Sequence, residues 1–276
     1  MSSHFARYYL ARHRDAADVV KRPALILLIA SLGLLALADG VLAEHGSAEG
    51  EALIAANPGD PAAYVTAAAD ARERGELGAA LDILEKGRDE LEPSAALLVA
   101  LGELYWDLEW TDDALAAYHA AVAADSSSAI ARYRVVTSMV TIGSVTAAES
   151  TCRQALERMP DSGLLHVALG ECLEKLEQLQ EAFGTYGRAL ELEPTLAAAH
   201  SRRGRLLCGM GQYEAAAVAC QTALEHDEND PIAHAYMGVA CSELGRFWEA
   251  QIHAEAAEQA GMSMESVWKR IGKWER

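Results

Sequence analysis

Three histidines, His166, His200 and His234, are evenly spaced along the sequence, and imidazole nitrogen is a common ligand of zinc. A shared metal would require the three rings to meet at one ion, with bonds of about 2 Å. Equal spacing of this length indicates instead the same position in three successive structural units, which lie too far apart to share an ion. The histidines are therefore interpreted as packing residues, and neither a metal site nor a cofactor is predicted.

The cysteines also form no recognisable chemical motif. There are five of them, Cys152, Cys172, Cys208, Cys220 and Cys241, and no two form a Cys-x-x-Cys pair. An odd count with these spacings predicts neither a zinc site nor a complete set of disulfides. Most are interpreted as small apolar core residues, with a Cys208–Cys220 bridge as the alternative.

Catalytic motifs give no signal either. The sequence has no glycine-rich phosphate loop, nucleophile elbow or His-Glu-x-x-His helix, so no enzymatic activity is predicted.

A dense basic cluster runs from His200 to Arg205, and Arg203 lies within it. The residues that precede and follow Arg203 by the same interval that separates the histidines are apolar. Arg203 is either a contact point or an arginine whose head reaches Glu191 or Glu193, and we prefer the second interpretation.

The charge of the chain is strongly uneven. The net charge is −18, but residues 1–22 carry a balance of +3, which leaves −21 for the rest. Such an acidic body repels the phosphate backbone, so nucleic-acid binding is not expected. Apolar or basic segments of other proteins are the expected partners.

An apolar stretch follows the basic leader. Residues 24–38 are uninterrupted, and the apolar run resumes at 41–43. As a helix, residues 23–43 would cover about 30 Å, the hydrocarbon thickness of a bilayer. We predict a transmembrane anchor there, with a cleaved signal peptide or a buried helix as alternatives.

The flanking charges predict the orientation of this anchor. Five Lys or Arg residues precede the apolar run, and none occurs from Pro23 to Ala71. The positive-inside bias therefore predicts a cytoplasmic N-terminus with the body on the far side, the periplasmic face of a bacterial inner membrane. A soluble or cytoplasm-facing body is the alternative.

Small side chains recur with a period of about 34 residues through most of the chain. We call the residues at the equivalent position of successive periods a column. One column is alanine throughout, at Ala80, Ala114, Ala148, Ala182, Ala216 and Ala250. Two antiparallel helices approach closely only where the facing side chains are small. Glycines that suit a helix end recur in phase as well, at Gly75, Gly143, Gly211 and Gly245. Together these columns predict a stack of helical hairpins.

The pattern of a small residue, a turn Gly, Ala, an aromatic or aliphatic residue, Ala and Pro over 34 positions resembles the tetratricopeptide repeat. The resemblance implies an all-α fold, a right-handed α-solenoid of antiparallel helix hairpins. The predicted organisation is a basic leader (1–22), a transmembrane helix (23–43), a linker with a half-repeat helix (44–60), six repeats (61–264) and a capping helix (265–276). The repeats are 61–94, 95–128, 129–162, 163–196, 197–230 and 231–264.

In this family the first helix of each hairpin lines the concave face, where ligands usually lie. Carried over by position, the partner-binding groove consists of Val99, Glu103, Trp106, Tyr133, Thr137, Val167, Glu171, Lys175, Arg202 and Arg205. Trp106 and Tyr133 would be exposed aromatic anchors for an apolar or basic peptide segment. The alternative is that these positions are ordinary solvated helix surface.

The resemblance thus predicts a non-catalytic scaffold or adaptor, anchored in a membrane, that recruits or assembles partners of a membrane-associated complex. Self-association through the ends of the stack is a further expectation. A permanent structural subunit of a large membrane assembly is the alternative.

Overall fold

The computed structural model describes residues 50–272, and these residues form helices and turns without strands. The predicted all-α fold is therefore confirmed. Two compact units meet in the sequence between Ala131 and Arg132. The predicted leader (1–22) and transmembrane helix (23–43) lie outside the described residues. Within residues 50–272, no helix combines the length and the apolar character needed to cross a bilayer.

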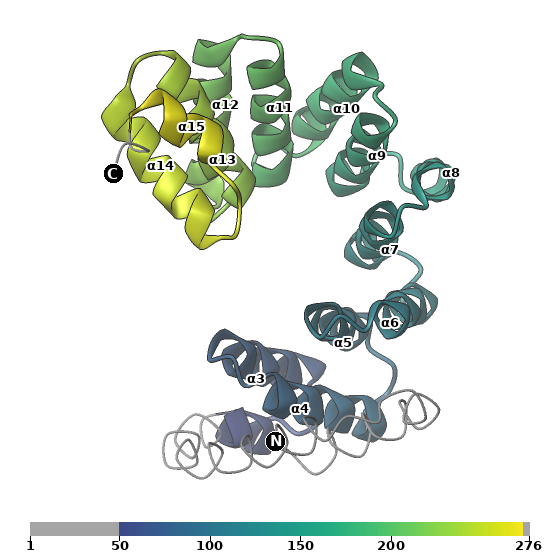
Figure 1. The fold of residues 1–276 in the computed structure, drawn as a ribbon. Helices are drawn as coiled ribbons and strands as arrows, with labels where there is room; N and C mark the ends of the chain where they lie inside the picture. The colour runs from purple at the N-terminus through teal and green to yellow at the C-terminus, as the bar shows by residue number, and fades with distance from the viewer. Residues whose placement is uncertain (1–49, 273–276) are drawn as a thin grey trace, which may run out of the picture. The chain divides into compact units, whose positions relative to one another are not determined.

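The first unit contains two helical hairpins, preceded by helical residues 50–56 (Figure 1). The hairpins are α3 (Pro61–Glu73) with α4 (Leu77–Glu90), and α5 (Ala95–Asp107) with α6 (Thr111–Ala124). The start of α3 is fixed locally, because the Asp60 carboxylate accepts a hydrogen bond from the Ala62 amide and Pro61 opens the first turn.

The second unit continues the same design (Figure 1). Its helices are α7 (Ala129–Thr141), which begins just before the division, α8 (Val145–Arg158), α9 (Gly163–Lys175), α10 (Leu179–Leu192), α11 (Ala197–Gly209), α12 (Tyr213–His226), α13 (Pro231–Glu243), α14 (Phe247–Gln259) and α15 (Glu265–Arg270). Ser162 and Asp230 cap α9 and α13 with their side chains. Each observed hairpin falls within one of the repeats predicted from the sequence.

The turn inside each hairpin uses a residue with positive φ. In four repeats this residue is one of the glycines identified in the sequence, with φ between 72° and 88°. Glu109 and Glu177 occupy the same position in the other two repeats, both at φ 61°. A left-handed backbone costs a residue with a side chain about 1–2 kcal/mol, so the tertiary packing imposes this turn even where glycine is missing.

Small residues lie where the helices of a hairpin meet. A Cβ atom added to Gly102 would lie 2.4 Å from the ring of Tyr118, and one added to Gly170 would lie 2.4 Å from the ring of Tyr186. Atoms in protein interiors do not approach this closely, so only glycine fits against these rings. The alanine column is buried throughout. The structure thus bears out the physical reason given for the small-residue columns.

Helix α15 covers the apolar core of α11 to α14. Val267 and Trp268 are buried in this core, together with Met264. The Trp268 indole N–H donates a hydrogen bond to the Glu258 carboxylate of α14. Residues 265–270 therefore occupy the capping position, while residues 273–276 of the predicted cap lie outside the described residues.

Candidate partner-binding face

A polar cluster connects three first helices of the second unit. Glu171 on α9 is only 8% exposed and lies between Tyr133 on α7 and Arg202 on α11. The Tyr133 hydroxyl donates to Glu171 Oε1 at 3.1 Å, and Arg202 Nη2 lies 2.9 Å from the same oxygen. A carboxylate buried without partners would be strongly destabilising, so both contacts are needed. They hold α7, α9 and α11 in a fixed arrangement.

Further along the same helices, Arg205 pairs with the buried carboxylate of Glu174. The Tyr186 hydroxyl on α10 is buried near Arg202, Glu171 and Tyr133, and it has no hydrogen-bond partner among the described residues. Burial raises the pKa of the Tyr186 hydroxyl. The pKa of Tyr133 is also raised, first by burial and then by the charge of Glu171. Both hydroxyls remain protonated at neutral pH, so neither has the character of a nucleophile.

The first unit links its first helices in the same way. Arg72 on α3 reaches two carboxylates of α5, with Nε 2.5 Å from Asp107 Oδ2 and Nη1 3.3 Å from Glu103 Oε2. The hydrogen bond to Asp107 is the main cause of the raised pKa of Arg72. These groups are partly exposed, so their ion pairs position the side chains more than they stabilise the fold.

The ion pairs between first helices share a spacing in the sequence that the predicted groove did not take into account. Glu103, Arg202 and Arg205 each pair with an oppositely charged residue 31 positions earlier in the chain. This separation in the sequence is shorter than one repeat by about one helical turn. It therefore places the two side chains next to each other on the first helices of neighbouring repeats. A search for opposite charges at this spacing would have identified Arg72 and Glu174 as ion-pair partners of groove residues. Neither residue was included in the predicted groove.

The predicted groove residues divide between the two units. Val99, Glu103 and Trp106 belong to the first unit, and the other seven belong to the second. Val99 is buried and Val167 is 0% exposed, so these two support the face and cannot contact a partner directly. Trp106 is half-buried rather than exposed as predicted.

The remaining predicted residues of the second unit differ widely in accessibility. Tyr133 is half-buried by its contact with Glu171, which corrects the expectation of an exposed anchor. Thr137 is half-buried as well, and its hydroxyl donates to the Tyr133 carbonyl at 3.0 Å. Lys175 is exposed at the end of α9. The accessible part of the predicted face is therefore smaller and more polar than the sequence indicated.

Arg203 does not make the contact predicted for it. Its guanidinium lies over the ring of Phe183, 4.7 Å from the ring centroid, rather than against Glu191 or Glu193. Glu191 pairs instead with Arg188, and Glu193 accepts a hydrogen bond from the amide of Gly163. The position is apolar in other repeats, and stacking on an aromatic ring lets an arginine occupy it.

The spaced histidines each bind a backbone carbonyl. Nε2 of His166, His200 and His234 lies 3.1, 2.9 and 2.8 Å, respectively, from the carbonyl oxygen six residues earlier. The Tyr64 hydroxyl, in the same column, donates to the Pro58 carbonyl in the same way. These hydrogen bonds connect the loop between two repeats to the first helix of the second of them. Within residues 50–272, no group of three or more His, Cys, Asp or Glu side chains is placed to hold a metal.

All five cysteines are free and buried, as expected for small core residues. The alternative Cys208–Cys220 bridge is therefore not present. Burial raises the pKa of Cys152 and Cys172 to about 12, and that of Cys208 and Cys241 to about 11. Because the thiolate is the reactive form, these thiols are poor nucleophiles.

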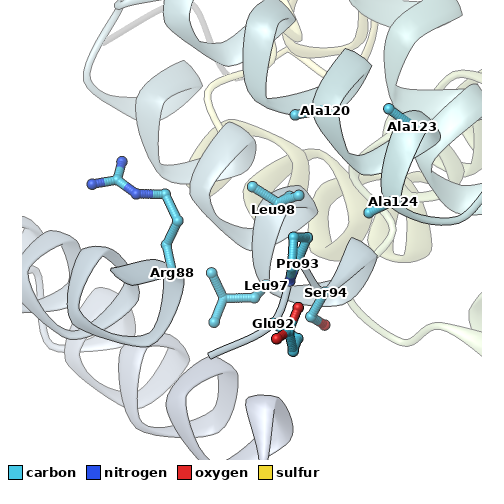
Figure 2. A pocket seen from close by; sticks show the side chains of 9 residues that line it. All are labelled: Arg88, Glu92, Pro93, Ser94, Leu97, Leu98, Ala120, Ala123 and Ala124. Atoms are coloured by element: carbon cyan, nitrogen blue, oxygen red, sulfur yellow. The ribbon is translucent and has the colours of Figure 1, made fainter. Parts of the chain in front are cut away.

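Hollows also occur on the side of the second helices, which sequence reasoning did not consider. One of them lies in the first unit and has a volume of about 440 Å³; Figure 2 shows the side chains that line it. Arg88 of α4, Leu97 and Leu98 of α5, and alanines near the end of α6 line it (Figure 2). An adjoining pocket of about 480 Å³ shares Arg88 and Leu98.

The hairpins, turns and small-residue columns described above can be compared with known proteins. The family model for the tetratricopeptide repeat matches residues 99–162 and 136–197. The chain is therefore similar to tetratricopeptide-repeat proteins over residues 99–197. A search of curated proteins found no match. Tetratricopeptide-repeat proteins act as scaffolds for protein–protein interaction and are generally non-catalytic.

Solved structures extend the likeness in fold to most of the chain. A chain of the APC/C hetero-tetramer Cut9–Hcn1 is similar over 80% of this chain and 45% of its own length, with a TM-score of 0.63 and 16% identity. A tetratricopeptide repeat protein from Parabacteroides merdae is similar over 87% of this chain and 97% of its own, with a TM-score of 0.59 and 16% identity. A thermophilic tetratricopeptide repeat protein of Thermus thermophilus is similar over 65% of this chain and 98% of its own, with a TM-score of 0.52 and 21% identity.

Proposed function

We propose that the chain is a non-catalytic scaffold that binds partner proteins on the face formed by its first helices. The observation that carries this proposal is the set of ion pairs between successive first helices, above all Glu171 with Arg202 and Tyr133. Side chains locked by buried hydrogen bonds lose little freedom on binding, which favours recognition by a prearranged surface. The half-buried Trp106 and the exposed Lys175 are the accessible contact residues.

The partner is an apolar or basic peptide segment. The body of the chain carries −21 outside residues 1–22, so a basic segment is attracted over long range. On the face itself, Glu171 and Glu174 are already neutralised by arginines. Long-range charge therefore governs the rate of encounter. Affinity depends on apolar contact, with Trp106 in the first unit or with the stems of the arginines in the second.

Substitution of Trp106 tests the binding face. The full chain, tagged and solubilised in detergent from its own cells, is used to capture partners that are quantified by mass spectrometry. Trp106→Ala is expected to reduce recovery of the specific partners by about tenfold, the loss of roughly 1.4 kcal/mol typical of an aromatic contact. Leu179→Ala, an exposed apolar residue on the second helix α10, is the matched control and is expected to leave recovery unchanged. Equal recovery with Trp106→Ala would overturn the proposed face.

We also propose that residues 23–43 anchor the scaffold in a bacterial inner membrane, with the N-terminus in the cytoplasm and the repeats in the periplasm. The apolar stretch and the distribution of Lys and Arg around it support this orientation. On this basis the scaffold recruits or assembles partners of a membrane-associated complex.

Protease protection tests the anchor and its orientation. In intact spheroplasts, added protease is expected to degrade the repeats completely, whereas in inverted membrane vesicles the repeats should be protected. A chain released from washed membranes by salt, or repeats protected in spheroplasts and cleaved in inverted vesicles, would refute the proposed topology.

One observation favours a second candidate, a permanent structural subunit. Val218 and Trp248 on second helices are largely exposed apolar residues, and a subunit is expected to present apolar surface on both sides of the repeats. The two candidates differ in behaviour after removal of residues 1–43. A scaffold should purify as a folded monomer, whereas a subunit should be unstable without its neighbours.

A further inference from the structure

The second helices of the second unit carry exposed apolar side chains that the proposed function does not use. Trp248 and Ile252, one turn apart on α14, are 73% and 48% exposed, and Val218 on α12 is 68% exposed. Val218 and Ile252 occupy the same position of successive repeats. Single exposed apolar residues are ordinary, but a group on neighbouring helices marks an interaction surface.

A groove lies between these two helices. It has a volume of about 440 Å³, with Val218 on its α12 side, Met237 of α13 beneath it and Glu249 on its α14 side. The lining residues of α12 run from Glu214 to Glu225, about 16 Å along the helix axis. This length matches about three turns of a helix laid along the groove. We call it the α12–α14 groove.

The charges of the α12–α14 groove select its occupant. Glu214, Glu225 and Glu249 line it, with Arg246 as the one basic residue among the lining side chains. A second copy of this acidic chain would meet like charge, and so would the surface of an anionic bilayer. A basic segment meets the opposite charge along the groove and apolar side chains beside it.

We propose that the α12–α14 groove is a second docking site, which binds a basic amphipathic helix of a partner protein. The apolar stripe of that helix packs on Val218, Ile252 and Trp248. Its Lys or Arg side chains lie against Glu214 and Glu225. This site is on the opposite helices of the hairpins from the face proposed above, so one chain holds two partners, or two parts of one partner, at once.

Titration with designed helices tests the groove. The probe is a fluorescein-labelled amphipathic helix of Leu and Lys, about 18 residues long, and its counterpart has Glu in place of every Lys. Binding to the full chain in detergent is followed by fluorescence anisotropy at about 0.15 M salt, where long-range attraction between exposed charges is screened. The Leu–Lys helix is expected to bind at least about tenfold more tightly than the Leu–Glu helix.

Two variants locate the binding. Val218→Ser with Ile252→Ser, and Glu214→Lys with Glu225→Lys, should each weaken binding of the Leu–Lys helix by about tenfold or more. The matched controls change exposed residues of the second unit elsewhere: Ile142→Ser with Leu179→Ser for the apolar pair, and Glu157→Lys with Asp161→Lys for the charged pair. The controls should stay within about twofold of the unaltered chain. All altered side chains are exposed, so circular dichroism should show an unchanged fold.

Three results would overturn the proposal. The first is equal loss of binding in the groove variants and their controls, which would mean general attraction to an acidic protein. The second is a dimer in sedimentation experiments that Trp248→Ala dissociates, which would make the occupant a second copy. The third is binding to phosphatidylcholine vesicles by the chain without residues 1–43, lost on Trp248→Ala, which would make the patch a membrane contact.

Discussion

Gly170→Ala is expected to destabilise the second unit by about 2 kcal/mol, although alanine is the better helix former. The added methyl group would lie 2.4 Å from the ring of Tyr186, which is itself fully buried. The ring is held in the core cluster formed by α7 to α11, so it has no free space to move into. Overpacking therefore outweighs the gain of roughly 1 kcal/mol in helix propensity.

Gly184→Ala, in α10, is the matched control for this prediction. No atom lies within 4 Å of a Cβ added there, so only helix propensity changes, and stability should rise by up to about 1 kcal/mol. Urea unfolding followed by far-UV circular dichroism compares the two variants with the unaltered chain. Equal stability of the two alanine variants would contradict the proposed close contact between the helices of a hairpin.

Arg202→Met is expected to destabilise the second unit by about 3 kcal/mol. Methionine preserves most of the apolar stem, so the main loss is the positive charge beside the buried Glu171 carboxylate. The Tyr133 hydroxyl, which also donates to Glu171, cannot compensate for a full charge. An unpaired buried carboxylate then either stays charged at high cost or takes up a proton.

A double variant separates the ion pair from simple loss of packing. Arg202→Met combined with Glu171→Gln removes both charges, and it should recover most of the lost stability. The matched control is Arg188→Met, because the pair of Arg188 with Glu191 is exposed and should contribute less than about 1 kcal/mol. If the double variant were as unstable as Arg202→Met alone, the buried charge would not be the cause.

The repeating fold could be predicted from the sequence because close helix packing restricts the size of the side chain at fixed intervals. The alanine column and the glycines at the turns share one period, and the observed hairpins follow that period. The same phase places Glu109 and Glu177 at the left-handed turn position, where their residue type alone gives no signal. A period thus predicts backbone position better than any single residue does.

The side-chain contacts of the candidate site were harder to predict from the sequence. A column shows which helix face a residue occupies, but the direction of a long side chain depends on its neighbours. Arg203 therefore stacks on Phe183 instead of pairing with a glutamate, and Glu171 is buried by Tyr133 and Arg202 instead of being open to a partner. Val167, which was also predicted to line the groove, is completely buried in the core. The apolar patch around Trp248 lies on a second helix, where the family resemblance implies no ligand.

Photo-crosslinking measures the position of the partner most directly. A photoreactive amino acid replaces Lys175, which is exposed on the first-helix face, or Glu157, which is exposed on the second helix α8. Neither site belongs to the α12–α14 groove or to the buried ion pairs. Illumination of cells should join the partner to the chain through position 175 and not through position 157. Crosslinks through position 157 alone would contradict binding on the first helices.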